Sequence, residues 1–319
     1  MKNPLARSLG WYRAPVVVIA VLASLLLIVP FLVLVSTSWT SGSFILFPPE
    51  GFSLQWYAEV LSDRRWMGSF WLSVWTATIS TVMAAVLGTA GAIGLTRVRS
   101  RTAQRWIRTL FIVPIALPPI AYAVGLYGVN LELGFLRGTL VTLIIGHALI
   151  AMPYVFVIVS GGIARIDPAL RPAASTLGAR WPLILWKIEL PALLPYLLSS
   201  ALFAFIIVFD EVVLAVFLLP PGMQTLPLRM LNASQEAFSP ELTAASTLVS
   251  LLAILVLGLL PLSTAIRKRR AGRSAPTASS SSSSSSRRRP RPAALAIGGG
   301  PLCQPRRYFG ARHLAPCDG

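Results

Sequence analysis

Six long apolar runs, separated by polar stretches, dominate the hydrophobic pattern of this chain. Each run reaches the length of about 20 residues that an α-helix needs to cross the hydrocarbon core of a membrane. The pattern predicts membrane spans at residues 15–36, 70–95, 110–129, 140–159, 193–219 and 242–266. The first run is longer than the apolar core of a signal peptide, and no small-residue cleavage site follows closely, so we expect it to be a spanning helix.

The residues around these runs predict how the helices begin, bend and pack. Ser53–Tyr57 precedes the second span and predicts a short helix at the membrane interface, where its aromatic side chains are favoured. Small residues between Gly88 and Gly94 predict close packing of the second span. Pro114, Pro118 and Pro119 predict a kinked third span that packs inside protein, because the freed backbone groups need partners.

The longest polar connection between two of the later spans, Ile163–Pro191, carries helix signals of its own. Asp167 followed by Pro168 is typical of a helix start, and Gly178 is typical of a helix end with a positive φ. A second short helix is predicted from Trp181 to Leu190, closed by Pro191. Apolar residues recur at helical spacing at Leu170, Ala173, Ala174 and Leu177. The segment therefore predicts either a helix–turn–helix at the membrane surface that a partner can approach closely, or an ordinary loop with a short helix.

The composition agrees with a membrane protein. The chain has 319 residues, of which 55% are hydrophobic and only 12% are charged. The formal net charge is +17, but the basic residues lie in short loops between apolar runs and in a tail, which argues against a nucleic-acid-binding surface. We therefore predict an all-helical protein with an N-terminal segment 1–14, a membrane domain 15–268 and a disordered tail 269–319 rich in serine and arginine.

The distribution of positive charge predicts the orientation. Six spans place both termini on one side of the membrane. With that side inside, 24 of the 28 lysines and arginines are cytoplasmic, and only Arg64, Arg65, Arg137 and Arg229 lie outside. The excess of positive charge predicts cytoplasmic termini and a cytoplasmic segment 163–191.

The sequence contains no motif for catalysis or for a bound cofactor. The lysines Lys2, Lys187 and Lys268 do not follow the glycines of a phosphate-binding loop, so any ATP that drives this protein is expected to bind another polypeptide. The cysteines and histidines are Cys303, Cys317, His147 and His313. Their spacing fits no familiar metal site, so no metal or other cofactor is predicted on this chain, and the chain is not expected to be an enzyme.

Two adjacent acids, Asp210 and Glu211, interrupt the apolar fifth run. A carboxylate in hydrocarbon costs several kcal/mol on most scales, so such groups usually face a bundle interior or an aqueous path. Neighbouring helical residues point about 100° apart, so at most one of the two is expected to face such a path. The alternative is a structural carboxylate that caps a helix break or pairs with an arginine.

The segment 163–191 resembles the "EAA" loop of ABC importer permeases. The residues that match are Ala173, Ala174, Gly178, Ile188, Leu190 and Pro191, at the spacing of that loop. The family's acidic residue is replaced by Pro172. The resemblance implies six spans in the type I importer fold of a bacterial inner membrane, with the loop as a coupling helix between spans 4 and 5. It also implies a second permease subunit, a cytoplasmic ATPase dimer and an external substrate-binding protein as partners.

Further residues resemble spermidine/putrescine permeases in particular. The stretches are Phe52–Tyr57, Phe209–Val213, Gly222 and Thr225–Pro227. This resemblance implies polyamine import, with Asp210 or Glu211 on the substrate path. Permeases for iron(III), thiamine and phosphonate share much of the pattern and remain alternatives. A different class, an autonomous proton-coupled transporter with one of these acids as its proton site, also remains open.

Overall fold

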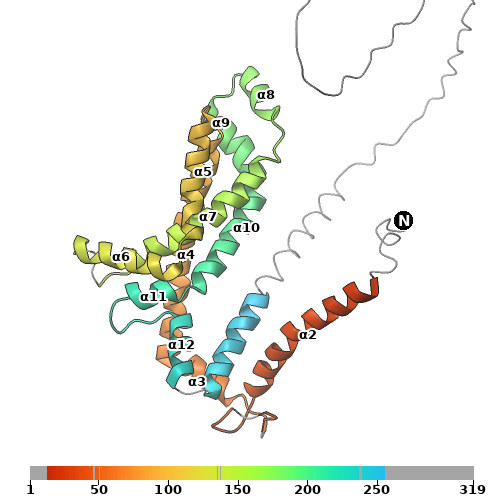
Figure 1. The fold of residues 1–319 in the computed structure, drawn as a ribbon, viewed down its shortest axis with the longest axis vertical. Coiled ribbons are helices and arrows are strands. Elements are labelled where there is room, and N and C mark those ends of the chain that lie inside the picture. The colour runs from red at the N-terminus through yellow and green to blue at the C-terminus, as the bar shows by residue number, and fades with distance from the viewer. Residues whose placement is uncertain are drawn as a thin grey trace, which may run out of the picture. The chain divides into compact units, whose positions relative to one another are not determined.

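The computed structural model describes residues 13–45, 47–49, 51–134, 136, 138–236 and 239–255, and all regular secondary structure within them is helical (Figure 1). The elements are α2 Arg13–Thr37, α3 Gln55–Ser62, α4 Arg64–Leu95, α5 Arg101–Ala116, α6 Pro119–Leu133, α7 Val141–Ile163, α8 Leu170–Thr176, α9 Trp181–Ile184, the π-helical segment η1 Leu185–Glu189, α10 Leu190–Phe209, α11 Val213–Leu218 and α12 Leu226–Glu236. A last apolar helix covers Pro240–Leu255. The predicted tail 269–319 lies outside the described residues.

Four helices in the described part of the chain are long and apolar enough to cross a membrane: Pro15–Thr37, Arg64–Leu95, Val141–Ile163 and Trp181–Phe209. They confirm the first, second, fourth and fifth predicted spans, with shifted ends. The sixth predicted span corresponds to the helix Pro240–Leu255, and residues 256–266 of that prediction lie outside the described part. The short helix predicted before the second span is confirmed as α3.

The third predicted span is two helices and not one kinked helix. α5 and α6 meet at an angle of 102°. Leu117 and Pro118 between them have ψ values of 133° and 130°, which are extended. A residue that precedes a proline is pushed out of the helical region of φ/ψ space. This applies to Leu117, which precedes Pro118, and to Pro118, which precedes Pro119. The chain therefore turns sharply between α5 and α6. The two helices together make a fifth membrane span only if both belong to one crossing.

The fifth predicted span differs at both ends. Its helix begins at Trp181, so the predicted separate helix 181–190 is the first part of this 29-residue helix. Pro191 does not end it, because η1 precedes the proline and the N–H of Leu190 bonds to the carbonyl of Leu185, five residues back. The wider π turn removes the clash that a proline makes with the preceding α-helical turn. At the other end the helix stops at Phe209, and α11 starts at Val213.

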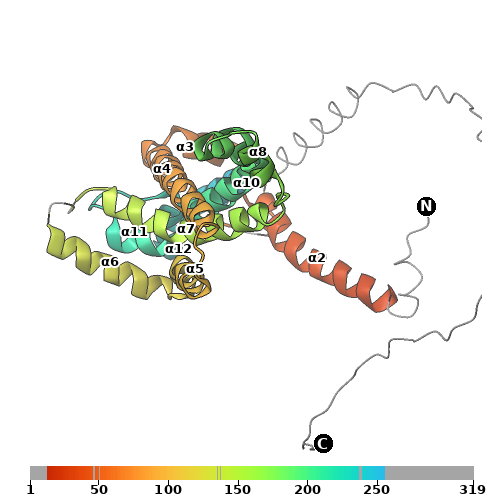
Figure 2. The same cartoon turned by 90° about the horizontal axis from the view of Figure 1, so that it is seen from above.

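The core of the bundle lies where α4, α7 and α10 pack together (Figures 1 and 2). Ser80 on α4 donates a hydrogen bond to the carbonyl of Ile144 on α7 at 3.0 Å. A Cβ at Gly88 would lie 2.9 Å from the carbonyl oxygen of Met152 and 2.8 Å from the Cβ of Val155. The predicted close packing of the second span is therefore confirmed, since only glycine fits at this point of the α4–α7 contact.

We expect Gly88→Ala to lower the amount of folded protein. The added methyl group meets backbone in a packed interior, and such overpacking costs about 1–3 kcal/mol. Thermal unfolding of the detergent-solubilised protein measures the effect. Gly94→Ala is the matched control, because a Cβ at Gly94 has no heavy atom within 4 Å. Equal unfolding temperatures for the two variants would contradict the close α4–α7 contact.

Candidate functional site

The connection between α7 and α9 folds into a defined surface helix. Asp167 Oδ1 accepts a hydrogen bond from the N–H of Ala169 at 2.9 Å, and α8 begins at Leu170. The predicted start at Asp167–Pro168 was therefore too early, because the aspartate organises the turn ahead of the helix. At the other end, Gly178 has the predicted positive φ, +81°.

The end of α8 is a Schellman motif. The N–H of Ala179 bonds to the carbonyl of Ala174 at 3.1 Å, and the N–H of Gly178 bonds to the carbonyl of Ser175 at 3.0 Å. This pair of bonds satisfies carbonyls that the helix itself leaves free, and it requires a left-handed residue at Gly178. Local hydrogen bonds thus define where α8 begins and ends.

The residues of α8 differ in how far the rest of the chain covers them. Arg171 and Ala174 turn toward the rest of the chain, and Ala174 is only 7% exposed. Leu170, Ala173 and the C-cap residue Leu177 are exposed, Leu177 to 89% and Leu170 to 44%. We call these three residues the apolar face of α8. Of the two alanines in the predicted motif, only Ala173 is exposed.

The remaining three motif residues lie on the following membrane helix. Ile188 belongs to η1, and Leu190 and Pro191 begin α10. Ile188 and Leu190 are half-buried, whereas Pro191 is exposed. The structure therefore divides the motif between the surface helix with its cap and the first turns of a spanning helix.

Polar contacts join α8 and α9 to the end of α4. Arg171 forms an ion pair with Glu189, and its Nη1 donates a hydrogen bond to Thr96 Oγ1 at 3.3 Å. The guanidinium of Arg97 lies 3.7 Å from the ring centroid of Trp181. Glu189 was not identified as a site residue from the sequence. The signal that could have identified it is a single carboxylate within an apolar stretch.

The two acids of the fifth run lie at a helix break. Asp210 ends α10 and is exposed, and Glu211 is half-buried. Glu211 Oε1 accepts hydrogen bonds from the N–H groups of Val213 at 2.7 Å and Leu214 at 3.2 Å. Glu211 therefore caps α11, which is the structural alternative considered for this pair, while Asp210 is exposed.

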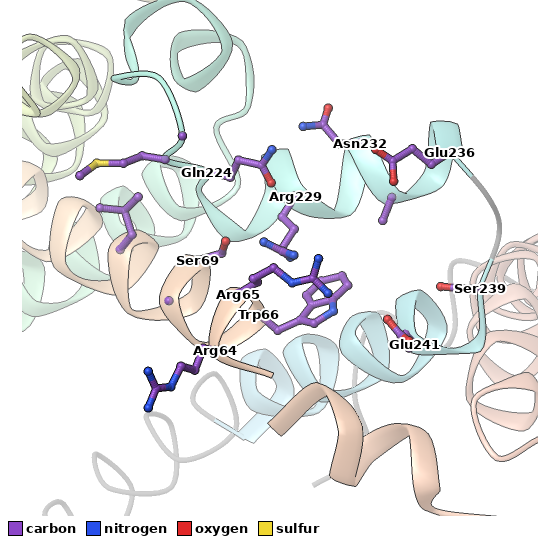
Figure 3. A pocket seen from close by; sticks show the side chains of 15 residues that line it. Arg64, Arg65, Trp66, Ser69, Gln224, Arg229, Asn232, Glu236, Ser239 and Glu241 are labelled. Atoms are coloured by element: carbon purple, nitrogen blue, oxygen red, sulfur yellow. The ribbon is translucent and has the colours of Figure 1, made fainter. Parts of the chain in front are cut away.

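A second polar region lies at the end of the bundle where α4 begins (Figure 3). It is a pocket of about 810 Å³. Its charged lining residues are Arg64, Arg65, Arg229, Glu236 and Glu241. The guanidinium of Arg229 lies 5.1 Å from the ring of Trp66, and burial, followed by the charge of Arg65, lowers the pKa of Arg229. The pocket carries charges of both signs, and sequence reasoning did not single it out.

The fold and these sites define an all-helical membrane subunit with a short exposed helix on its surface and a polar break in a spanning helix. The family model described as "Binding-protein-dependent transport system inner membrane component" matches residues 84–266, more than half of the chain. The chain belongs to this family. It is therefore a membrane-embedded transport subunit that works with a binding protein and an ATPase, and it is not itself an enzyme.

Two curated relatives cover most of the chain. The spermidine/putrescine transport system permease protein PotC of Haemophilus influenzae is 31% identical over 238 residues, which are 75% of this chain and 91% of the relative. The putrescine transport system permease protein PotI of Escherichia coli is 29% identical over 238 residues, which are 73% of this chain and 84% of the relative.

A solved structure shares the fold. It is a bacterial ABC transporter involved in the import of the acidic polysaccharide alginate, with a TM-score of 0.66, 13% identity, and coverage of 84% of this chain and 99% of that chain. Together with the family match, this likeness confirms the type I ABC importer permease fold.

Proposed function

We propose that this chain forms half of the translocation path of an ABC importer for polyamines, with its termini and α8 in the cytoplasm and with α8 docked on the ATPase. The observation that carries the proposal is the apolar face of α8, exposed on a helix whose end is defined by local hydrogen bonds and which an ion pair joins to the bundle. Burial of exposed leucine side chains under a partner removes apolar surface from water and so stabilises the complex.

The proposed orientation rests on the distribution of charge. Arg97, Arg99 and Arg101 lie at the same end of α4 as the contacts of α8. Arg171 lies within α8, and Arg165 and Arg180 flank it. Basic residues accumulate in the cytoplasmic loops of membrane proteins. This end of the bundle is therefore where a cytoplasmic ATPase can reach the chain.

The mechanism that follows is alternating access. Closure of the ATPase dimer on ATP moves α8, and α8 moves the helices that it contacts, so that the path opens toward the outside and accepts substrate from the binding protein. The permease pair contributes the path, and the two ATPase subunits contribute the free energy of hydrolysis. Whether the second permease is an identical chain or a different one is decided by the mass of the purified complex.

The proposed substrate class rests on the relatives and on Asp210. The two relatives are named for putrescine and spermidine transport. An exposed carboxylate at a helix break attracts a polycation, and low-dielectric walls strengthen this attraction. Ferric ion and a thiamine-like cation would be attracted in the same way. The choice of a polyamine among these cations therefore rests on the similarity to the two relatives.

Reconstituted uptake tests this function. Proteoliposomes with the complete transporter should accumulate labelled spermidine when ATP and the loaded binding protein are present, and an ionophore that collapses the proton gradient should have no effect. Uptake that follows the proton gradient in the absence of the ATPase would contradict the proposal. A binding protein that retains a phosphonate and not a polyamine would overturn the substrate class alone.

We expect Gly178→Leu to weaken the attachment of the ATPase. A Cβ at Gly178 meets no heavy atom within 4 Å, so the penalty is conformational and not steric crowding. A left-handed conformation costs a branched residue about 1–2 kcal/mol, which favours a different end to α8. Co-purification of the ATPase measures the loss. Gly178→Asn is the matched control, because asparagine tolerates this conformation, and equal loss in both variants would contradict the role of the positive φ.

A further inference from the structure

Arg171 is the only residue of α8 in the described part of the chain that the structure shows in an ion pair. Its guanidinium reaches two different helices. The Nε atom pairs with Glu189 at the end of η1, and Nη1 bonds to Thr96, which caps α4. Arg171 thus joins the surface helix to two of the three helices that make up the core of the bundle.

Glu189 depends on this contact. The residue is only 2% exposed, and its Oε2 has no hydrogen-bond partner among the described residues. A buried carboxylate is costly unless a charge pairs with it, so Glu189 holds Arg171 in one position. Arg171 in turn is partly exposed, with 38% of its side chain accessible. The pair therefore fixes one side of α8 against the bundle.

The chain itself provides looser connections. Residues 164–169 lead from α7 to α8, and residues 177–180 lead from α8 to α9, without regular helix in either stretch. A displacement of α8 could be absorbed in these turns before it reached a spanning helix. The ion pair bypasses both of them, since Glu189 lies within the continuous helix Trp181–Phe209.

We infer that Arg171 is the positioning residue that transmits the movement of α8 to the membrane helices, through Glu189 to the helix Trp181–Phe209 and through Thr96 to α4. The inference rests on the proposed function of α8 as the ATPase-docking helix. Pro172, beside Arg171, carries no charge, and the ion pair that the structure shows for α8 is directed inward, to its own bundle.

The test measures how many substrate molecules are imported for each ATP hydrolysed by the complete transporter in proteoliposomes. Arg171→Ala leaves Glu189 buried and unpaired, so this variant lowers the abundance of the complex as well. The double variant Arg171→Ala/Glu189→Gln removes the unpaired charge and should restore abundance. We expect the import per ATP to stay about tenfold below wild type in the double variant, as for other couplings between sites.

Arg171→Lys should recover part of the import per ATP, because it keeps the charge but not the two-sided contact. Arg165→Ala is the matched control, an exposed arginine ahead of α8, and should leave the ratio at the wild-type value. A double variant that recovers both abundance and the wild-type ratio would overturn the inference, because the pair would then serve folding alone. Wild-type complex without ATP-dependent uptake would instead contradict the proposed function.

Discussion

Leu177→Asp should release the ATPase from the purified transporter while the permease remains abundant in the membrane. Leu177 is 89% exposed in the isolated chain, so a carboxylate at this position disturbs no packing within the chain. In the docked complex the same carboxylate would be buried against an apolar surface without a partner, which is costly. Loss of a central interface residue costs at least about 2 kcal/mol, which corresponds to about 30-fold in affinity.

Co-purification and the stimulation of ATP hydrolysis by the loaded binding protein measure this loss. Leu231→Asp is the control, since Leu231 is an exposed leucine on α12, 40% accessible, and its replacement makes the same change of charge away from α8. The docking assignment is wrong if the Leu177 variant keeps its ATPase and normal stimulation. It is also wrong if the Leu231 variant loses the ATPase to the same extent, because the effect would then come from charge alone.

Asp210→Asn should reduce polyamine uptake about tenfold without reducing the amount of folded transporter, which is the lower end of the range for electrostatic attraction of a charged ligand. The exposed side chain of Asp210 keeps its shape in the variant and loses only its charge. Initial rates of spermidine uptake at low substrate concentration measure the effect, because attraction of the substrate matters most there.

Glu211→Gln provides the comparison for Asp210. The carboxyl group of Glu211 caps α11 through the N–H groups of Val213 and Leu214, and the amide oxygen of glutamine can accept the same bonds. We therefore expect near-normal uptake and abundance from this variant. If both variants lose uptake and folded protein in parallel, the two acids stabilise the helix break, and neither attracts substrate.

The parts of the fold that the sequence predicted are those that local signals determine. Long apolar windows located the spans because burial in lipid needs about 20 residues whatever the neighbours are. The positive φ of Gly178 was predictable because a helix end that leaves its carbonyls free favours glycine. The close helix contact at Gly88 was predictable because small residues are enriched where membrane helices pack closely.

The parts that the sequence did not predict depend on contacts between distant elements. Pro191 looked like a helix end, but η1 accommodates it within the helix that begins at Trp181. Ala174 looked equivalent to Ala173, but Ala174 is buried and Ala173 is exposed in the fold, where Arg171 of the same helix pairs with Glu189. The three prolines of the third run predicted a kink, but the 102° turn follows from the dihedral angles of Leu117 and Pro118.

Cross-linking from α8 tests the docking of the ATPase most directly. Cys303→Ser and Cys317→Ser remove both native cysteines. The further substitution Leu177→Cys then provides a single cysteine, which is labelled with a photoreactive maleimide in the assembled transporter. We predict a covalent product between the permease and the ATPase from this position, and none from the same label at Gln235, an exposed residue of α12. A complete, active complex that gives no ATPase product from Leu177, or gives one from Gln235, would contradict the account.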